Sequence, residues 1–363
     1  MASNGSDMDI TPDELFDYSE YYNLNGTSNS PPCDNKNIKN FGSVFLPILY
    51  TIVFVLGLVG NILVLALILS KCKKLKSMTD MYLLNLALSD LLFVLSLPFL
   101  AYYAADEWVF GSTMCHLVTL LYLFGYYSGI FFITLMSIDR YLAVVHAIFA
   151  LRARSITYGI ITSLVVWCVA FLATLPQLLL SEVQADSANK TCRPNYSSQG
   201  WKLFLNLEVI VLGFICPMII MGYCYTYILI VLIKSRNANK KKAIKLVFIV
   251  MITFQVFWAP YNCVILLDTL LQQKVLDGCE TSQGIMYTTQ VTEAIAFFHC
   301  CLNPLIYAFL GEKFQKYLCE VLQKILSLAP LCKSTGISRR YLSVRRSSVR
   351  TQSTGSSDLD IVL

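Results

Sequence analysis

The sequence predicts an all-α membrane protein: a seven-transmembrane helix bundle with a short amphipathic interfacial helix after the last span. Long apolar stretches recur along the chain, in which 56% of residues are hydrophobic and only 14% are charged. A helix that crosses the hydrocarbon core needs roughly 20 apolar residues and must satisfy its own backbone groups. A large soluble helical protein would show polar faces at the helical period along these stretches, and they have none.

The apolar stretches divide the chain into one membrane domain with two tails. We expect the membrane-crossing helices at 43–70, 81–105, 113–138, 158–180, 203–233, 246–273 and 284–310. The resulting domains are an extracellular acidic tail at 1–42, the bundle at 43–310, the interfacial helix at 311–331, and a disordered, phosphorylatable cytoplasmic tail at 332–363.

The distribution of Lys and Arg among the connecting segments sets the orientation. The segments 71–80, 139–157, 234–245 and 311–363 hold 22 of these residues, and the segments on the opposite side hold 6. Because positively charged loops stay cytoplasmic during insertion, the N-terminus is predicted to be extracellular. We therefore expect a multi-pass protein of the plasma membrane. Because the N-terminal segment is polar and acidic, unlike a cleavable signal peptide, the first span is expected to serve as its own insertion signal.

The extracellular segments are strongly acidic. They carry 13 acidic and 6 basic residues, a net charge of −7. Such a charge steers a basic partner toward this side, although acidic loops that are merely solvated explain it equally well. In the N-terminal tail, Tyr18, Tyr21 and Tyr22 lie beside the carboxylates of Asp17 and Glu20. Sulfation of these tyrosines would add hydrogen-bond acceptors for Arg and Lys of a protein ligand.

Glycosylation sequons and cysteines support the same topology. The Asn-x-Ser/Thr sequons begin at Asn4, Asn25, Asn189 and Asn195, all on segments assigned to the outside. Four cysteines also lie outside or at the outer membrane edge, and four cysteines allow three pairings. Because the exterior is oxidising, we predict two disulfides, Cys115–Cys192 and Cys33–Cys279.

Ionisable residues inside the spans are costly, so each is a functional candidate. There are four, Asp90, Glu208, Asp268 and Glu293. Glu208 and Asp268 lie toward the outer ends of their spans, and we expect them simply to reach water. Glu293 is the preferred candidate for a buried anionic anchor. Asp90 lies in mid-membrane, where polar side chains of other helices or a cation would have to satisfy it.

Motifs in every span resemble the rhodopsin-like G protein-coupled receptors. They are Gly60-Asn61, LNLALSD ending at Asp90, Asp139-Arg140-Tyr141, Trp167, Pro217 with Tyr225, Phe254 with FWAP at 257–260, and NPLIY from Asn303 to Tyr307. Any one of these motifs is weak evidence, but all of them in order in matching spans are highly specific. Prolines inside several spans fit a bundle with kinked helices and two conformations, although transporters use broken helices as well.

Within that family the chain resembles the CC-type chemokine receptors. The resemblance runs from about Cys33 to Phe314 and rests on SLP at 96–98, WVFG at 108–111, SIDRYLAVVHA at 137–147, HCCLNP at 299–304 and GEKF at 311–314. It implies a basic CC chemokine whose folded body docks on the acidic tail and whose N-terminus enters the bundle. Many relatives have a tryptophan two residues after the SLP proline, where this chain has Leu100.

The resemblance also implies roles for particular residues. Glu293 would pair with the terminal amine of the chemokine in a pocket lined by Tyr50, Tyr103, Tyr122, Trp258 and Tyr261, and helix packing is the alternative role of each aromatic. The signal would pass through Ile130, Pro217 and Phe254, then Asn303, Pro304, Tyr307 and Tyr225, to Asp139, Arg140 and Tyr141. Since residues 234–253 contain no Asp or Glu, Asp139 and hydroxyl groups would hold Arg140 in the inactive state.

The expected partners are a heterotrimeric G protein of the inhibitory class, receptor kinases and arrestin, and membrane lipid, with chemotaxis and calcium mobilisation as the response. Cys319 and Cys332 are candidate acylation sites on the interfacial helix. Asp90 is a possible sodium site, although Gly129 and His299 replace the usual polar helpers; no other cofactor is expected.

Three other classes of function compete. A non-signalling chemokine scavenger is the main alternative, but the intact segment from Asp139 disfavours it. A transporter would show internal repeats and more mid-membrane charge. The sequence has no phosphate-binding loop and no metal-spaced His or Cys set, so neither an enzyme nor a nucleic-acid partner is expected.

Overall fold

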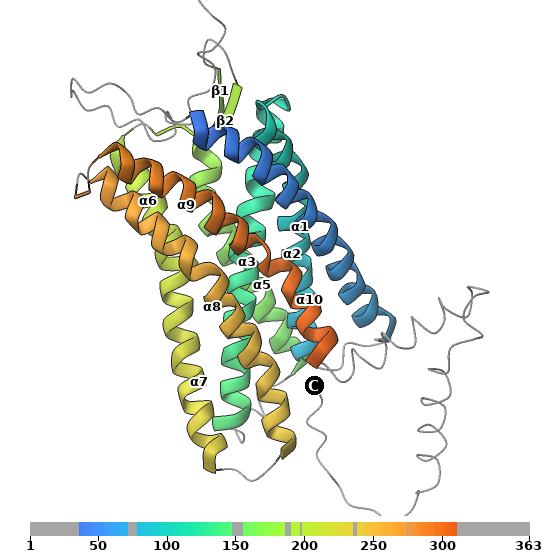
Figure 1. Ribbon diagram of the computed structural model, residues 1–363. Helices are drawn as coiled ribbons and strands as arrows, with labels where there is room; N and C mark the ends of the chain where they lie inside the picture. Colours follow the sequence, from blue (N-terminus) through green and yellow to red (C-terminus); the bar gives the residue numbers. More distant parts are fainter. Residues whose placement is uncertain are drawn as a thin grey trace, which may run out of the picture.

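The computed structural model describes residues 36–71, 78–146, 155–185, 190–196, 198–234, 238–273, 275–276 and 278–310. Within these ranges the protein is a bundle of long, roughly aligned helices with one two-stranded hairpin at one end (Figure 1). The predicted interfacial helix at 311–331 and both tails, apart from residues 36–42, lie outside the described residues. The predicted all-α membrane bundle is confirmed.

The first four spans are continuous helices. They are α1 (Lys36–Lys71), α2 (Met78–Ala105), α3 (Gly111–Val145) and α5 (Ile156–Leu180). The fifth span consists of α6 (Gln199–Ile210), a π-helical turn η2 (Val211–Ile215) and α7 (Cys216–Lys234), and the sixth is α8 (Ala238–Gln272). Six of the described spans are long and apolar enough to cross a membrane.

The seventh predicted span is divided into α9 (Cys279–Phe297) and α10 (His299–Leu310). At the division, the backbone N–H of Phe298 donates to Ile295 O at 3.2 Å, and the N–H of Cys301 donates to Phe298 O at 3.0 Å. These bonds span three residues instead of four, so the helix tightens locally and continues. The two helices together form the seventh crossing.

Most helices are longer than the apolar stretches that predicted them. α1 begins at Lys36 rather than at residue 43, and α8 begins at Ala238, inside the segment 234–245 that we expected to be a loop. Lys, Ala and Asn can continue a helix into water once the membrane-embedded part has formed. The apolar stretch therefore indicates the buried length of a helix, and its polar ends extend beyond it.

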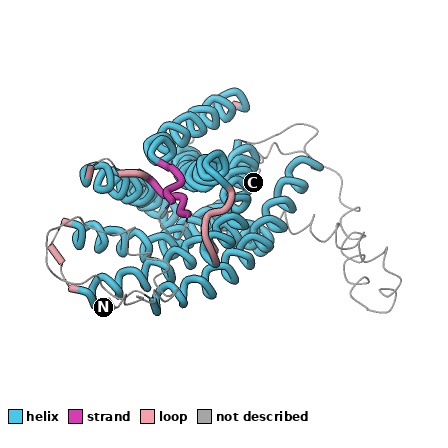
Figure 2. Tube along the Cα trace, turned by 90° about the horizontal axis from the view of Figure 1, so that it is seen from above, coloured by secondary structure: helices cyan, strands magenta, loops and turns pink. Residues whose placement is uncertain are grey.

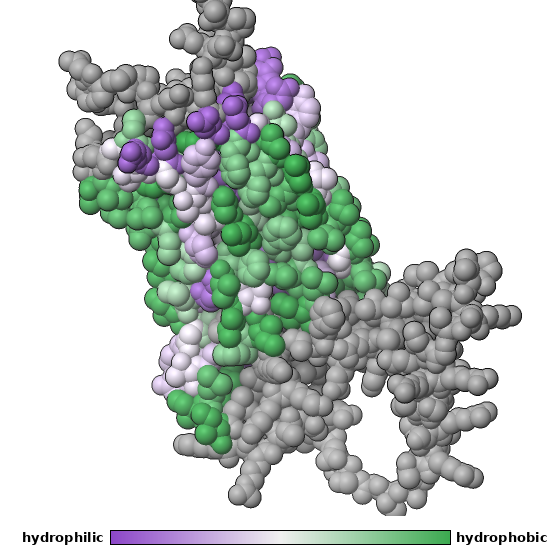
Figure 3. All heavy atoms as spheres, in the orientation of Figure 1, coloured by the Kyte–Doolittle hydropathy of each residue, from purple (hydrophilic) through white to green (hydrophobic). Residues whose placement is uncertain are grey.

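The outside of the bundle is apolar, as expected for a surface in contact with lipid. Large hydrophobic side chains such as Ile48, Leu172 and Ile219 are about 60% exposed. Figure 3 shows hydrophobic residues covering the middle of one face, with hydrophilic residues gathered toward the end that carries the hairpin. This band agrees with six helices of membrane-spanning length and composition.

Pro304 in α10 illustrates how the bundle tolerates proline. A helical proline has no N–H to donate, so the carbonyl four residues earlier, that of Cys300, loses its usual partner. The side-chain amide of Asn61 in α1 donates to this carbonyl at 3.1 Å and to Gly57 O at 3.0 Å. Asn61 is 1% exposed, so its side-chain amide and the carbonyl of Cys300 are satisfied within the protein.

α2 and α3 approach each other closely at Gly125. A Cβ atom on Gly125 would lie 2.5 Å from the backbone nitrogen of Phe93 and 2.8 Å from the backbone oxygen of Ser89. Neither atom is at the end of a flexible side chain, so no rotamer change would relieve the clash. Only glycine is compatible with this distance between the two backbones.

We expect Gly125→Ala to destabilise the receptor by about 1–3 kcal/mol, because the added methyl group must push two backbones apart. The thermal midpoint of the purified protein in lipid nanodiscs would fall accordingly. Gly222→Ala in α7 is the matched control, since a Cβ there meets no heavy atom within 4 Å. Equal midpoints for the two variants would contradict the close approach.

Candidate functional site

A hairpin covers the extracellular end of the bundle. Strand β1 (Ser181–Ala185) pairs antiparallel with β2 (Lys190–Pro194), with Val183 opposite Cys192. Seen along the bundle, the strands lie among the helix ends (Figure 2). The sequence predicted a loop for this segment.

The hairpin is fixed to α3 and to the α2–α3 connection. The predicted disulfide Cys115–Cys192 is confirmed, with the two Cα atoms 5.6 Å apart. The N–H of Trp108 donates to Lys190 O at 2.8 Å, and the N–H of Lys190 donates to the Glu107 carboxylate at 2.9 Å. The indole of Trp108 is 1% exposed, so this connection is part of a small core.

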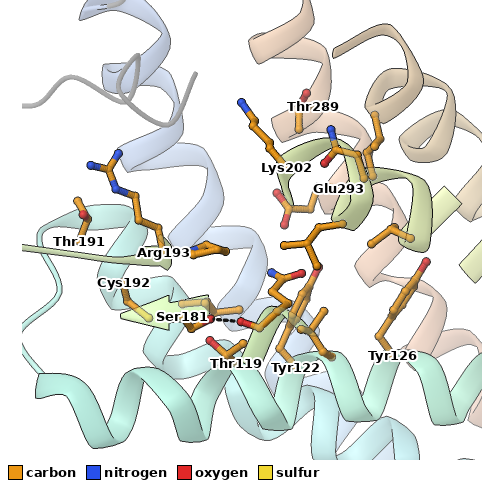
Figure 4. Close-up of a pocket in the computed structure, with 18 of the residues that line it drawn as sticks. Thr119, Tyr122, Tyr126, Ser181, Thr191, Cys192, Arg193, Lys202, Thr289 and Glu293 are labelled. Atoms are coloured by element: carbon orange, nitrogen blue, oxygen red, sulfur yellow. Dashed lines mark hydrogen bonds between the residues drawn. The ribbon is translucent and has the colours of Figure 1, made fainter. Parts of the chain in front are cut away.

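A cavity of about 290 Å³ lies beneath the hairpin. Its walls come from α2, α3, both strands, α6, α8 and α9. Figure 4 shows Tyr122 and Tyr126 rising from α3 on one side, with Lys202 and Glu293 on the opposite side. A space of this size between helices is typical of a ligand-binding site.

Several predicted ligand-binding residues line this cavity: Tyr103, Tyr122, Tyr261 and Glu293. Leu100, the departure noted in the sequence, lines it as well. Glu293 is partly buried, and within the described residues it makes no hydrogen bond or ion pair. A carboxylate in such surroundings is a strong acceptor for a cationic group, because it has no competing partner.

Two predicted pocket residues lie elsewhere. Tyr50 does not line the cavity: it is 5% exposed and stacks on Phe297 in the core, with ring centroids 5.3 Å apart. Trp258 lies beneath the cavity, where its ring is 4.6 Å from that of Tyr126. Tyr50 therefore has the packing role that was its alternative, and Trp258 packs against two rings of the cavity wall, those of Tyr126 and Tyr261.

The cavity also contains charged residues that the sequence analysis did not select. Asp268 lines it and is 7% exposed, which corrects our expectation that it simply reaches water. Lys202 and Arg193 add two positive charges, so the cavity is not uniformly acidic. Tyr261, Ile265 and Asp268 are spaced four and three residues apart and therefore share a helix face, which is the signal that could have identified Asp268.

Toward the cytoplasmic end, Arg140 and Asp139 are both buried, at 4% and 6% exposure. The Arg140 guanidinium donates to the hydroxyl of Thr79 in α2 at 2.6 Å. A hydroxyl partner for Arg140 is what the absence of acidic residues from 234–253 predicted. Tyr141 pairs through its hydroxyl with His146 Nε2 at 3.1 Å.

The remaining predicted signalling residues lie in the core. Ile130 and Phe254 belong to one hydrophobic cluster, and Pro217 is also buried, directly after the π-helical turn. The ring of Tyr225 packs against Phe248 at 5.4 Å, and its hydroxyl lies near Arg140. Pro304 is buried, and Tyr307 falls in α10, although its side chain lies outside the described residues.

In mid-membrane, Asp90 accepts a hydrogen bond from the amide of Asn303 at 2.9 Å. The side-chain oxygen of Asn303 is buried and accepts no hydrogen bond from the part of the chain that the structure describes. A Cβ on Gly129 would lie 3.9 Å from Asp90 Oδ1, so this position faces the carboxylate but contributes no oxygen. Among the described residues, no group of three or more His, Cys, Asp or Glu residues is arranged to bind a metal.

Asn195, from the predicted glycosylation sequons, and Cys279, from the second predicted disulfide, both lie within the described residues. Asn195 ends the hairpin, and its amide donates to Glu182 at 2.7 Å; Cys279 is disulfide-bonded. The other residues concerned lie outside the described residues: Cys33, Asn4, Asn25, Asn189, Asp17, Tyr18, Glu20, Tyr21, Tyr22, Cys319 and Cys332. Sulfation, glycosylation, acylation and the Cys33–Cys279 pairing stay predictions.

The fold, the hairpin and the cavity define a receptor with seven membrane-spanning segments. The chain belongs to the rhodopsin family of 7 transmembrane receptors, whose profile matches residues 60–307. It is 50% identical over 353 residues to C-C chemokine receptor type 4 of Homo sapiens, and the match covers 97% of each chain. The protein is thus a multi-pass receptor of the plasma membrane and not an enzyme.

Proposed function

We propose that the chain is a receptor for basic CC chemokines that transmits ligand binding to a heterotrimeric G protein of the inhibitory class. The observation that carries this proposal is the cavity beneath the hairpin, which is lined by Glu293, a carboxylate that pairs with no other described residue. The relative that is 50% identical is a C-C chemokine receptor, which supports a chemokine as the ligand class. Intact Asp139-Arg140-Tyr141 supports signalling over the alternative, a non-signalling scavenger.

In the proposed complex, the folded body of the chemokine contacts the acidic N-terminal tail, and its flexible N-terminus enters the cavity. The terminal ammonium pairs with the Glu293 carboxylate, while Tyr103, Tyr122 and Tyr261 supply aromatic walls. Long-range attraction by the net charge of −7 on the extracellular segments raises the association rate. The affinity comes from the buried contacts in the cavity.

Ring contacts connect the cavity to the core beneath it. Tyr126 lines the cavity and packs on Trp258 at 4.6 Å. Trp258 in turn lies 6.4 Å from Phe254, and Phe254 lies 5.6 Å from His299 in α10. A ligand that contacts Tyr126 differently in two receptor conformations would shift their populations through this series of rings.

At the cytoplasmic end, the proposed active state moves α8 outward and opens a groove for the C-terminal helix of the G protein. Arg140 must then leave the groups that hold it in the inactive state, among them the hydroxyl of Thr79. Because residues 234–253 contain no Asp or Glu, the inner end of α8 adds no carboxylate to this restraint, which is therefore comparatively weak. We infer a low barrier to activation, with subsequent tail phosphorylation by receptor kinases and arrestin binding.

We also propose that sodium binds at Asp90 and favours the inactive state. Asp90 and the unpaired oxygen of Asn303 supply hard oxygen ligands, although Gly129 adds none. Agonist affinity should then be lower in sodium chloride than in choline chloride at the same ionic strength, and Asp90→Asn should remove the difference. Identical agonist affinity in the two salts would rule sodium out.

Glu293→Gln should lower chemokine potency about tenfold or more, since a charge-assisted bond to the ammonium is replaced by a neutral one. The measurement is chemokine-stimulated nucleotide exchange in membranes, with surface expression matched. Glu280→Gln, an exposed carboxylate at the start of α9 and outside the cavity, is the control. Full potency in Glu293→Gln would contradict the proposed contact. Chemokine binding to the wild-type receptor without any nucleotide exchange would favour the scavenger.

Thr79→Val should raise basal nucleotide exchange by up to about tenfold, because Arg140 loses a charge-assisted hydrogen bond present in the inactive state. Thr134→Val is the matched control, since among the described residues that buried hydroxyl bonds only the carbonyl of Ile130 in its own helix. A basal rate that stays level or falls in Thr79→Val would show that this bond does not restrain activation.

A further inference from the structure

The side of α6 that faces away from the cavity carries an acidic residue beside two aromatic residues. The residues of α6 that line the cavity are Lys202, Leu205, Asn206 and Val209. On the opposite side of the helix, Trp201 and Phe204 are 43% and 47% exposed, and the partly buried Glu208 follows them. Because residues three, four and seven apart share one side of a helix, these three side chains lie together. In a membrane this side of α6 faces lipid.

Glu208 makes no hydrogen bond and no ion pair with any residue that the structure describes. It differs in this place from the other acidic residues predicted within the spans, since Asp268 and Glu293 line the cavity and Asp90 lies in the core. An ionised group within a span is costly unless a cation or hydrogen-bond donors accompany it. A cation from outside the protein would remove that cost.

Trp201 and Phe204 form a corner of two nearly perpendicular rings. The ring centroids lie 5.8 Å apart, and the ring planes are inclined at 87°. The face of an aromatic ring attracts a cation, and proteins bind quaternary ammonium groups between such rings. Two perpendicular rings with a carboxylate one turn further along the helix therefore provide three sides of a site for a quaternary ammonium group.

The depth of Glu208 in the bilayer matches that of a lipid headgroup. α6 begins at Gln199, shortly after the extracellular hairpin, so Trp201 lies in its first turn, and tryptophan is typical of the boundary between headgroups and acyl chains. Seven residues of helix place the backbone of Glu208 roughly 10 Å deeper. Because side chains of a helix tilt toward its N-terminus, the carboxylate is directed back toward Phe204 and the headgroups of the outer leaflet.

We propose that Trp201, Phe204 and Glu208 bind the choline headgroup of one phosphatidylcholine molecule of the outer leaflet. The trimethylammonium group lies against the two rings and pairs with the Glu208 carboxylate. The acyl chains continue along the exposed side chains of Leu207 and Val211. None of these five residues lines the cavity, so the lipid site is separate from the proposed chemokine site.

Native mass spectrometry of the full-length receptor in detergent micelles tests this site. The delipidated receptor is offered equal amounts of phosphatidylcholine and of an analogue in which a carbon atom replaces the choline nitrogen. The analogue keeps the shape of the headgroup, the phosphate and the acyl chains but lacks the positive charge. We expect the wild type with one bound lipid to carry phosphatidylcholine roughly ten times as often as the analogue, because both the rings and the carboxylate require the charge.

Variants then assign this preference to residues. Glu208→Gln and Trp201→Leu should each lower the ratio of the two bound lipids by about threefold, and the double variant should bring it close to one. Glu280→Gln removes an exposed carboxylate at the start of α9, and Tyr102→Leu removes a ring of α2 that is 44% exposed. These two controls should leave the ratio unchanged.

Three outcomes would overturn the proposal: equal binding of the two lipids to the wild type, a ratio that stays unchanged in Glu208→Gln and Trp201→Leu, or an equal fall of the ratio in the control variants. The comparison on the wild type needs no variant, so it remains decisive if a variant fails to fold. None of these measurements uses a chemokine, so the lipid site can fail while chemokine signalling stands, and the reverse.

Discussion

The constraint on which this structure depends is that backbone polar groups inside a bilayer must find their partners within the protein. It requires helices across the whole membrane, and it becomes visible wherever a helix is interrupted. The carbonyl of Cys300, which Pro304 leaves without its usual donor, is satisfied by the amide of Asn61 from another helix. A buried polar side chain here permits irregular backbone, and irregular backbone is where helices can change shape.

The extracellular end follows a different rule, because water is available there. A two-stranded ribbon is only marginally stable by itself. Here a disulfide to α3 and hydrogen bonds to the residues around Trp108 fix it above the helix ends. The cavity exists because this cover is held in place, and its charged residues come from elements that are far apart in the sequence. The ligand-binding cavity and the packed helices beneath it are therefore formed by different sets of contacts, and aromatic side chains connect the two.

The number and order of the spans could be predicted from the sequence, because apolar length reports directly on the bilayer. The Cys115–Cys192 disulfide was predictable because cysteines on an oxidising exterior tend to be bridged, and a hydroxyl partner of Arg140 was predictable because residues 234–253 contain no Asp or Glu. The hairpin was not, because its stability comes from tertiary contacts and not from an alternating pattern. Asp268 was misjudged because its depth in a span was considered without the face of α8 that it shares with Tyr261. Tyr50 was misplaced because the resemblance fixes its helix position, and rotation of its ring into the core depends on Phe297.

The glycine contact between α2 and α3 has a consequence for motion. The backbones of α2 and α3 approach so closely at Gly125 that sliding or rotating one helix against the other would bring main-chain atoms into collision. The two helices therefore move as one rigid unit. The same unit carries Cys115 and hence the hairpin at one end, and both Thr79 and Arg140 at the other. A rearrangement that couples the extracellular cavity to the cytoplasmic end must then come from movement of the remaining helices relative to α2 and α3.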